Sequence, residues 1–168
     1  MIRGYRSDHR IGVIRLFREF MEELTPPRLA TEFRAYIEAA IREELGRIED
    51  YYLSKPRQGF WIAEEEEGVA GMVGLERHSD DAAELRRMAV AAAHRRRGIG
   101  RRLLETAEAF ARTQAYTTIV LSTSELQMRA MRLYESSGYR RTRSEVATEP
   151  SHKTPGAGLT RYWYEKRF

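Results

Sequence analysis

The chain has no cysteine, so disulfide bonds, thiolate metal sites and a cysteine nucleophile are all excluded. No apolar run approaches the roughly 18 residues of a membrane span, and the opening segment MIRGYRSDHR lacks the apolar core of a signal peptide. Histidine is also scarce, and the four that occur do not stand at metal-ligand spacing. We therefore expect a cytoplasmic protein with no metal and no membrane partner.

Neither sign of charge dominates, because 29 Lys+Arg stand against 25 Asp+Glu. The net charge of +4 is mild and locally concentrated, whereas a nucleic-acid partner would require a broader basic face. We therefore do not expect nucleic-acid binding. A length of 168 residues with 42% hydrophobic content suffices for a buried core, so we expect one soluble domain over residues 1–168.

What the chain does contain is a basic turn with two glycines, HRRRGIG, between an apolar strand and an amphipathic helix. The first-turn N–H groups of a helix have no partner inside it and favour an anion, and glycine lets a ligand approach the backbone. Four arginines stand in this turn: Arg95, Arg96, Arg97 and Arg101. The pattern is typical of a polyphosphate site. No Lys-Ser/Thr pair follows the glycines and position 103 is leucine, so it is neither a Walker loop nor a dinucleotide fingerprint.

Apolar periodicity predicts strands and helices that alternate in one mixed α/β sheet. The run TIVLST at 118–123 is nearly all apolar or β-branched, as expected of a buried parallel strand. Gly71 and Gly74, inside a strand at 69–75, predict the close approach of a neighbouring segment. Further strands are expected at 2–5, 60–63, 84–90, 139–147 and 159–168, and helices at 7–24, 31–50, 99–112 and 125–137.

Two segments carry a resemblance to a known family. Residues 95–100 match the Arg/Gln-x-x-Gly-x-Gly/Ala signature of the GCN5-related N-acetyltransferases (GNAT superfamily), and AMRLYESSGY at 130–139 resembles its A-x-x-L-Y-x-x-x-G-F/Y segment. The element order is also similar, well from about residue 60 onward and loosely before it. The resemblance implies a single-domain α/β GNAT fold: a mixed, mostly antiparallel sheet whose parallel central pair is splayed around acetyl-CoA and flanked by helices.

Four longer segments of the chain resemble one subgroup of the superfamily, the cysteine-S-conjugate and aspartate N-acetyltransferases. The matching segments are FWIAEEEEGVAGMVGL, ELRRMAV, HRRRGIG and TSELQMRAMRLYESSGY. In that subgroup a Leu-Gln pair, here Leu126 and Gln127, stands where many GNAT proteins have Asn. The chain departs from the subgroup in having no hydrophobic segment at 24–58, Ala92 in place of Pro, and Arg96 in place of Gly.

The resemblance implies that acetyl-CoA is the cosubstrate. Its pyrophosphate would bind the N–H groups from about Arg96 to Arg101, and its pantetheine would pair with the backbone of the central strand, where an N–H can also polarise the thioester carbonyl. The implied cofactor-binding residues are Met88, Ala89, Val90, Arg95, Arg96, Arg97, Gly98, Ile99, Gly100, Arg101 and Gln127.

Two catalytic residues are predicted. By the family motif, Tyr134 faces the sulfur of CoA and protonates the departing thiolate; the alternative is a packing role. Glu84, which opens the central strand, is the candidate base that takes the amine proton, and strand alternation places it on one side with Arg86 and Met88. Glu76 and His78 are alternative bases, and each of these charged groups could instead be merely solvated.

We expect an N-acetyltransferase that moves an acetyl group to a primary amine of a small molecule, an amino acid or its conjugate, by direct attack in a ternary complex. Alternatives are a peptide or protein N-terminus or lysine as acceptor, or a non-enzymatic CoA-binding or nucleic-acid-binding module. The family architecture places the acceptor cleft at 23–31 and 148–158, where Arg34 or Lys153 could bind a carboxylate or be surface charges. A homodimer is left open, since dimers are common in the superfamily.

Overall fold

The computed structural model describes residues 1–168 and contains one seven-stranded sheet in the order β1-β2-β3-β4-β5-β7-β6. Every neighbouring pair is antiparallel except β4 and β5, which are parallel. The predicted mixed sheet with a parallel central pair is therefore confirmed. The strands are β1 (Ile2–Gly4), β2 (Gly59–Glu65), β3 (Gly68–Arg77), β4 (Ala82–Val90), β5 (Thr118–Ser124), β6 (Arg140–Ala147) and β7 (Leu159–Arg167).

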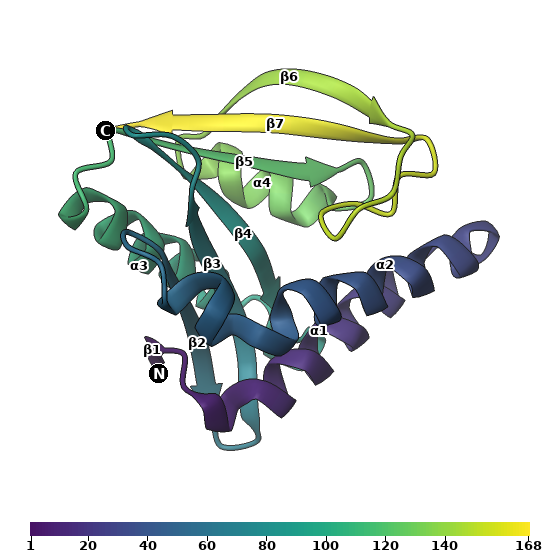
Figure 1. Ribbon diagram of the computed structural model, residues 1–168, viewed down its shortest axis with the longest axis horizontal. Coiled ribbons are helices and arrows are strands. Elements are labelled where there is room, and N and C mark those ends of the chain that lie inside the picture. Colours follow the sequence, from purple (N-terminus) through teal and green to yellow (C-terminus); the bar gives the residue numbers. More distant parts are fainter.

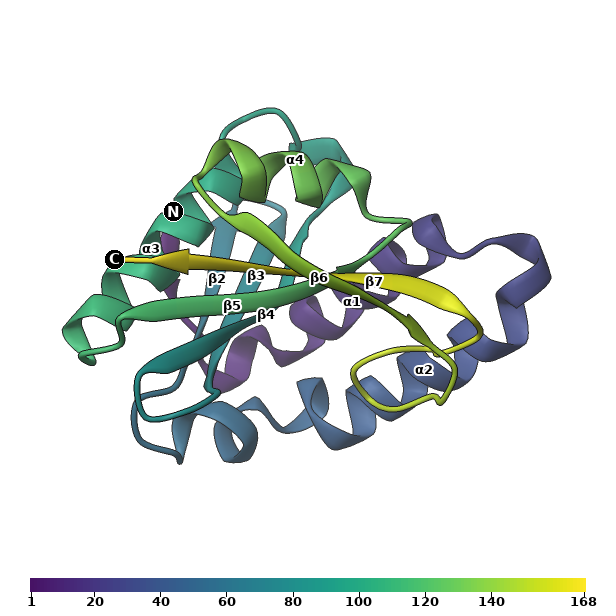
Figure 2. The same cartoon turned by 90° about the horizontal axis from the view of Figure 1, so that it is seen from above.

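Helices cover both faces of this sheet (Figure 1, Figure 2). The longer helices are α1 (Arg10–Leu24), α2 (Ala30–Glu43), α3 (Ile99–Thr113) and α4 (Met128–Ser136). One core cluster packs α1 and α2 against one face through Phe17 and Ile37, and the other packs α3 and α4 against the opposite face through Leu103 and Met131. Apolar residues of the strands belong to both clusters, so burial on both faces fixes the strand register.

The sheet opens at its centre because β4 and β5 pair only where they begin. Their register includes Ala82 with Thr118, Ala83 with Ile119 and Glu84 with Val120, and pairing stops there. From 85 to 90 the side of β4 that faces β5 therefore has no strand partner. Figure 1 shows β5, β7 and β6 crossing the upper part of the molecule while β2 and β3 descend away from them. A free strand edge with unpaired N–H and C=O groups is a binding surface for an extended ligand.

A bulge in β4 corrects the predicted alternation of Glu84, Arg86 and Met88. The register runs from Arg86 opposite Gly74 to Ala89 opposite Met72, so two residues of β4 oppose Val73 alone. Arg87 has a φ of 56°, which turns the strand locally. As a result Arg86 and Arg87 reach the same carboxylate on the α2 side, whereas Met88 packs against the cluster on the α3 side.

Three of the four predicted helices are shorter in the structure, and α3 matches its predicted range to within one residue. Short helical turns precede α1 and α2, and α2 ends at Glu43 rather than near residue 50. The reason is Glu44, whose φ of −137° leaves the helix and directs a fully buried carboxylate into the protein. The following residues form a π-helical turn over Glu49–Leu53. Ile11 of α1 is 82% exposed despite its apolar side chain, because Val13 and Leu16 occupy the buried side of the helix.

Gly71 and Gly74 of β3 lie against neighbouring segments at close distance, as the sequence predicts. A Cβ at Gly71 would lie 2.9 Å from the Leu103 side chain of α3, and one at Gly74 would lie 2.9 Å from the ring of Tyr52. Both distances are below normal packing contact. Glycine therefore lets α3 and the π-helical turn pack directly on opposite faces of β3.

Candidate active site

An outer cleft of about 700 Å³ follows the free edge of β4 and the start of α3. Its lining includes ten of the eleven predicted cofactor-binding residues; the exception is Arg97. The ten are Met88, Ala89, Val90, Arg95, Arg96, Gly98, Ile99, Gly100, Arg101 and Gln127. The structure thus brings the free strand edge and the glycine turn into one concave surface.

The glycine turn presents backbone donors to this cleft. Gly98 stands just before α3 with a φ of 75°, and a Cβ there would meet no atom within 4 Å. The first bond within this turn runs from the Arg102 N–H to the Gly98 carbonyl at 3.1 Å. The N–H groups of the three residues between them therefore have no partner inside the helix, and they lie at the positive end of its dipole. This geometry suits an anion with several oxygens.

The arginines of the turn differ in how they are engaged. Arg95 is held on α1, because its Nη1 and Nη2 lie 2.7 and 2.6 Å from the Glu23 carboxylate and its Nε donates to the Val90 carbonyl at 3.1 Å. Arg97 contacts His94 at 2.9 Å and Glu65 at 3.6 Å. Arg96 has no ion pair. The cleft also receives Arg101, Arg129 and Arg132, and Glu23 is its single carboxylate.

Beside the outer cleft, an inner cavity of about 110 Å³ lies between the two halves of the sheet. The two spaces adjoin near the end of β4 and the segment before α4, because six residues line both of them. The shared residues are Phe20, Leu24, Met88, Ala89, Leu126 and Gln127. The Gln127 side chain accepts a hydrogen bond from the Thr123 hydroxyl at 2.5 Å, which orients it at this junction. Both predicted catalytic residues, Tyr134 and Glu84, line the inner cavity.

Tyr134 comes from the last turn of α4 and is 5% exposed. Its ring packs among those of Tyr139 and Tyr164, with centroids 5.9 and 6.2 Å away. Burial raises the pKa of the Tyr134 hydroxyl above its ordinary value, because the ionised form is desolvated. The hydroxyl is therefore protonated at neutral pH, as a proton donor must be.

Glu84 is also 5% exposed and lies where β4 and β5 separate. Its carboxylate is 3.5 Å from Lys153 Nζ and 3.8 Å from His78 Nδ1. Lys153 also donates to Glu76 at 2.7 Å, and Arg86 donates to Glu76 at 3.1 Å. Burial alone would raise the pKa of Glu76, but Arg86 and Lys153 outweigh it and lower that pKa. The two candidate carboxylates thus share one half-buried cation from the loop after β6.

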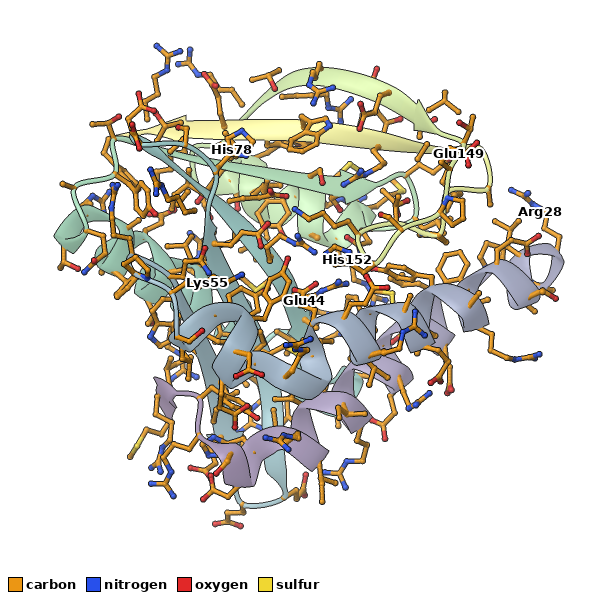
Figure 3. The ribbon with its side chains drawn as sticks, viewed as in Figure 1. Arg28, Glu44, Lys55, His78, Glu149 and His152 are labelled. Carbon is orange, nitrogen blue, oxygen red and sulfur yellow. The ribbon has the colours of Figure 1, made fainter.

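A buried ion network behind the cavity was not predicted from the sequence. Glu44 is fully buried and accepts from Arg86 at 3.0 Å, from Arg87 at 2.5 Å and from the Tyr52 hydroxyl. Burial would raise its pKa, yet Arg87 and Arg86 lower the pKa of Glu44 to about 2. Figure 3 shows Glu44 near the centre of the molecule, close to His152, whose carbonyl accepts from Arg87. The available signal was the Arg-Arg pair within an apolar strand, since buried arginines require carboxylates.

One further cation, Arg161 of β7, lines the inner cavity and was also missed. Its Nη2 donates to the Ser122 hydroxyl at 2.5 Å, and its Nη1 is 3.7 Å from Glu145. Of the two residues considered for an acceptor carboxylate, Lys153 lines the cavity, whereas Arg34 is exposed and lies outside it. The loop after β6 also contributes Thr154 and Pro155 to the cavity wall.

Residues 13–139 match the model of the acetyltransferase (GNAT) family. The chain belongs to this family. It is 38% identical to human N-acetyltransferase 8B over 112 residues, covering 64% of this chain and 49% of the relative. It is 37% identical to human N-acetylaspartate synthetase over 139 residues, covering 80% of this chain and 45% of the relative. The predicted subgroup resemblance is thereby confirmed, and the chain spans about half the length of these relatives.

The GNAT fold is equally clear from solved structures. An acetyltransferase of the family from Staphylococcus aureus Mu50 superimposes with a TM-score of 0.78 at 20% identity, covering 99% of this chain and 98% of the other. No helix here is both long and apolar enough to traverse a bilayer. The structure holds no cluster of three or more His, Asp or Glu side chains suited to a metal ion.

Proposed function

We propose that residues 1–168 form one N-acetyltransferase domain that moves the acetyl group of acetyl-CoA to the primary amine of a small molecule. The observation that carries this proposal is the junction of two spaces in a GNAT family member: a basic outer cleft along a free strand edge, and an inner cavity that holds Tyr134 and Glu84. The outer cleft binds the donor and the inner cavity binds the acceptor.

In the outer cleft the N–H groups from Arg96 to Arg101 bind the pyrophosphate, and the edge of β4 at Met88–Val90 pairs with the pantetheine arm. Gln127, at the junction, contacts the arm near its end. A backbone N–H of the free β4 edge stabilises the negative charge that develops on the thioester oxygen. Such a preorganised donor contributes about 3 kcal/mol to the transition state.

In the inner cavity the amine nitrogen attacks the thioester carbonyl carbon while both substrates are bound. The new C–N bond forms as the C–S bond breaks, and the Tyr134 hydroxyl gives its proton to the departing thiolate sulfur. Glu84 accepts the proton that the amine loses. Direct attack needs no acetylated enzyme intermediate, in accord with the absence of cysteine from the chain.

The small volume of the inner cavity favours a small acceptor. Its volume of about 110 Å³ and its closure by the loop that carries Lys153, Thr154 and Pro155 favour a compact amine over a protein side chain. The resemblance to N-acetylaspartate synthetase, whose name denotes an acetylated amino acid, supports the same class.

Calorimetric titration with acetyl-CoA tests the donor, with ATP and a DNA duplex as controls. We expect selective binding of acetyl-CoA, followed by CoA thiol release when a small amine is added. Absence of acetyl-CoA binding together with salt-sensitive DNA binding would overturn the proposal and reassign the arginine turn to a nucleic acid.

A further inference from the structure

The walls of the inner cavity carry charges that do not cancel. Four cations line it: Arg86, Arg87, Lys153 and Arg161. The three buried carboxylates in contact with this group are Glu44, Glu76 and Glu84. Each of them is within 3.5 Å of Arg86, Arg87 or Lys153, and none forms an ion pair with Arg161. Arg161 is therefore the one cation of the four that has no partner among these three buried carboxylates.

The partners that Arg161 does have leave its charge weakly compensated. Ser122 is a neutral acceptor, and the nearest oxygen of Glu145, the residue opposite Arg161 on the neighbouring strand β6, lies 3.7 Å away. That carboxylate also accepts hydrogen bonds from Arg143 at 2.8 Å and from the Trp163 indole at 3.1 Å, so its negative charge is shared with a second arginine. The Arg161 side chain is only 15% exposed, and its burial lowers the pKa of the guanidinium. A buried cation without a matched anion is costly, so an anionic ligand would be bound strongly here.

The position of Arg161 suits an acceptor that carries opposite charges at its two ends. Arg161 stands on β7 opposite Ser124 of β5, whereas Glu84 stands on β4. The two side chains thus come from the two halves of the opened sheet and line the same cavity as Tyr134. An amine near Glu84 would direct a second group of the same small molecule toward the β7 wall. A planar carboxylate matches the fork of a guanidinium.

Building on the proposed function, we propose that Arg161, with Ser122, binds a carboxylate of the acceptor and thereby restricts the acceptors to amines that carry a free carboxylate. Arg161 is then the specificity-determining residue of the cavity. An amine of the same shape without the anion leaves the guanidinium unpaired and is a poor substrate.

The test compares L-amino acids with their α-carboxamides as acceptors, with the side-chain amides of aspartate and glutamate included. Carboxylate and carboxamide have nearly the same shape and differ in charge. We expect wild-type kcat/KM to favour the carboxylates by about 10- to 100-fold, the discrimination typical of a charged hydrogen bond. Arg161→Gln should abolish this preference by slowing the carboxylates alone, and Arg161→Lys should restore part of it.

Arg143→Gln is the matched control. Arg143 binds the same Glu145 and stacks on the same Trp163, with its guanidinium 4.5 Å from the ring centroid, but it does not line the cavity. This variant should keep the wild-type preference. Equal slowing of carboxylates and carboxamides by Arg161→Gln, or loss of the preference in Arg143→Gln, would overturn the assignment.

An equilibrium measurement separates this inference from the proposed function. Titration of N-acetyl-L-amino acids and their carboxamides into the CoA-bound protein requires no turnover. If the protein acetylates none of the amines, the proposed function fails, and tighter binding of the carboxylates to wild type than to Arg161→Gln would still assign the anion site. Equal binding of both ligand sets would overturn the anion site as well.

Discussion

The outer cleft and the inner cavity are adjacent but are built in opposite ways. The outer cleft is lined mainly by two short stretches of the chain, 88–101 (the end of β4, the glycine turn and the start of α3) and 126–133 (the start of α4). The inner cavity collects side chains from α1, α2, β4, β5, α4, the loop after β6 and β7. The outer cleft has an excess of arginine, whereas most inner charges are already paired.

This difference has a physical basis in what each space holds. A polyphosphate carries several negative charges, and backbone N–H groups with a few exposed arginines bind it without any specific side-chain set. A small acceptor must be oriented to about an ångström, which needs side chains locked by their neighbours. A local segment can build the first kind of site. Only tertiary structure can build the second.

The sharpest test of the inner cavity is Tyr134→Phe. Loss of a general acid typically lowers kcat by about 10²- to 10⁴-fold, whereas acetyl-CoA affinity should stay unchanged because the outer cleft is intact. Tyr139→Phe is the matched control, since its ring packs against Tyr134 and its hydroxyl is buried without a hydrogen-bond partner. Steady-state kinetics and calorimetry measure both. If Tyr134→Phe retained full turnover, the proton would come from another group.

The next largest effect should come from Glu44→Gln, which breaks the ion network behind the cavity. Removing one partner of a buried ion pair typically costs about 3–5 kcal/mol. Here Arg87 would keep its charge without any carboxylate partner, and Arg86 would keep only Glu76. Denaturant unfolding at pH 7 measures the loss. Glu38→Gln, on the preceding helix α2, removes an exposed carboxylate 2.5 Å from Arg18 and should cost less than about 1 kcal/mol. Equal losses would show that the buried network has no special weight.

Glu44 also has a pH signature. Its folded-state pKa of about 2 lies below the ordinary 4.5, so its stabilisation is fully present above pH 4.5 and is lost as the pH falls toward 2. That difference corresponds to on the order of 3 kcal/mol. Unfolding free energies measured between pH 7 and pH 2 should fall more steeply for the wild type than for Glu44→Gln. Parallel curves would contradict the assigned pKa.

In the outer cleft, Gly98→Glu should weaken acetyl-CoA binding by about 100-fold. The new carboxylate repels the pyrophosphate, and a φ of 75° strains any residue with a Cβ by about 1 kcal/mol or more. Gly158→Glu is a close control, because Gly158 has the same φ, equally open surroundings and no place in the outer cleft. Calorimetry should therefore show a large loss only at Gly98. Equal affinities would mean that the donor binds elsewhere.

The contrast between the two spaces also explains what the sequence could predict. The strands, the glycine turn and the family follow from short periodic or contiguous patterns, and the structure confirms them. Tyr134 is predicted from a family motif and Glu84 from its place at the start of a strand, and both line the inner cavity. Their catalytic roles stay predictions.

The missed features depend on contacts between distant residues. Nothing near Glu44 in the sequence reveals that its carboxylate meets Arg86 and Arg87, 42 and 43 residues away. The bulge at Arg87 shifts the side-chain alternation of β4 by one residue, which a strict period of two cannot reproduce. Arg161 is one of the polar residues that alternate with apolar ones in the predicted strand at 159–168, and nothing in that pattern shows that it lines a cavity.

The smallest expected effect separates two arginines of the outer cleft. Arg95 is held by Glu23 and the Val90 carbonyl. Arg95→Gln should therefore lower the free energy of unfolding by about 0.5–1 kcal/mol, which corresponds to about 2 °C in Tm. It should change the affinity for acetyl-CoA by less than about threefold. Arg96 has no such partner and is free to meet the phosphates, so Arg96→Gln should leave Tm unchanged and weaken binding by about three- to tenfold. Thermal unfolding and calorimetry on both variants decide the matter. Reversed results would assign Arg95 to the phosphates, in which case acetyl-CoA must break its ion pair with Glu23 to bind.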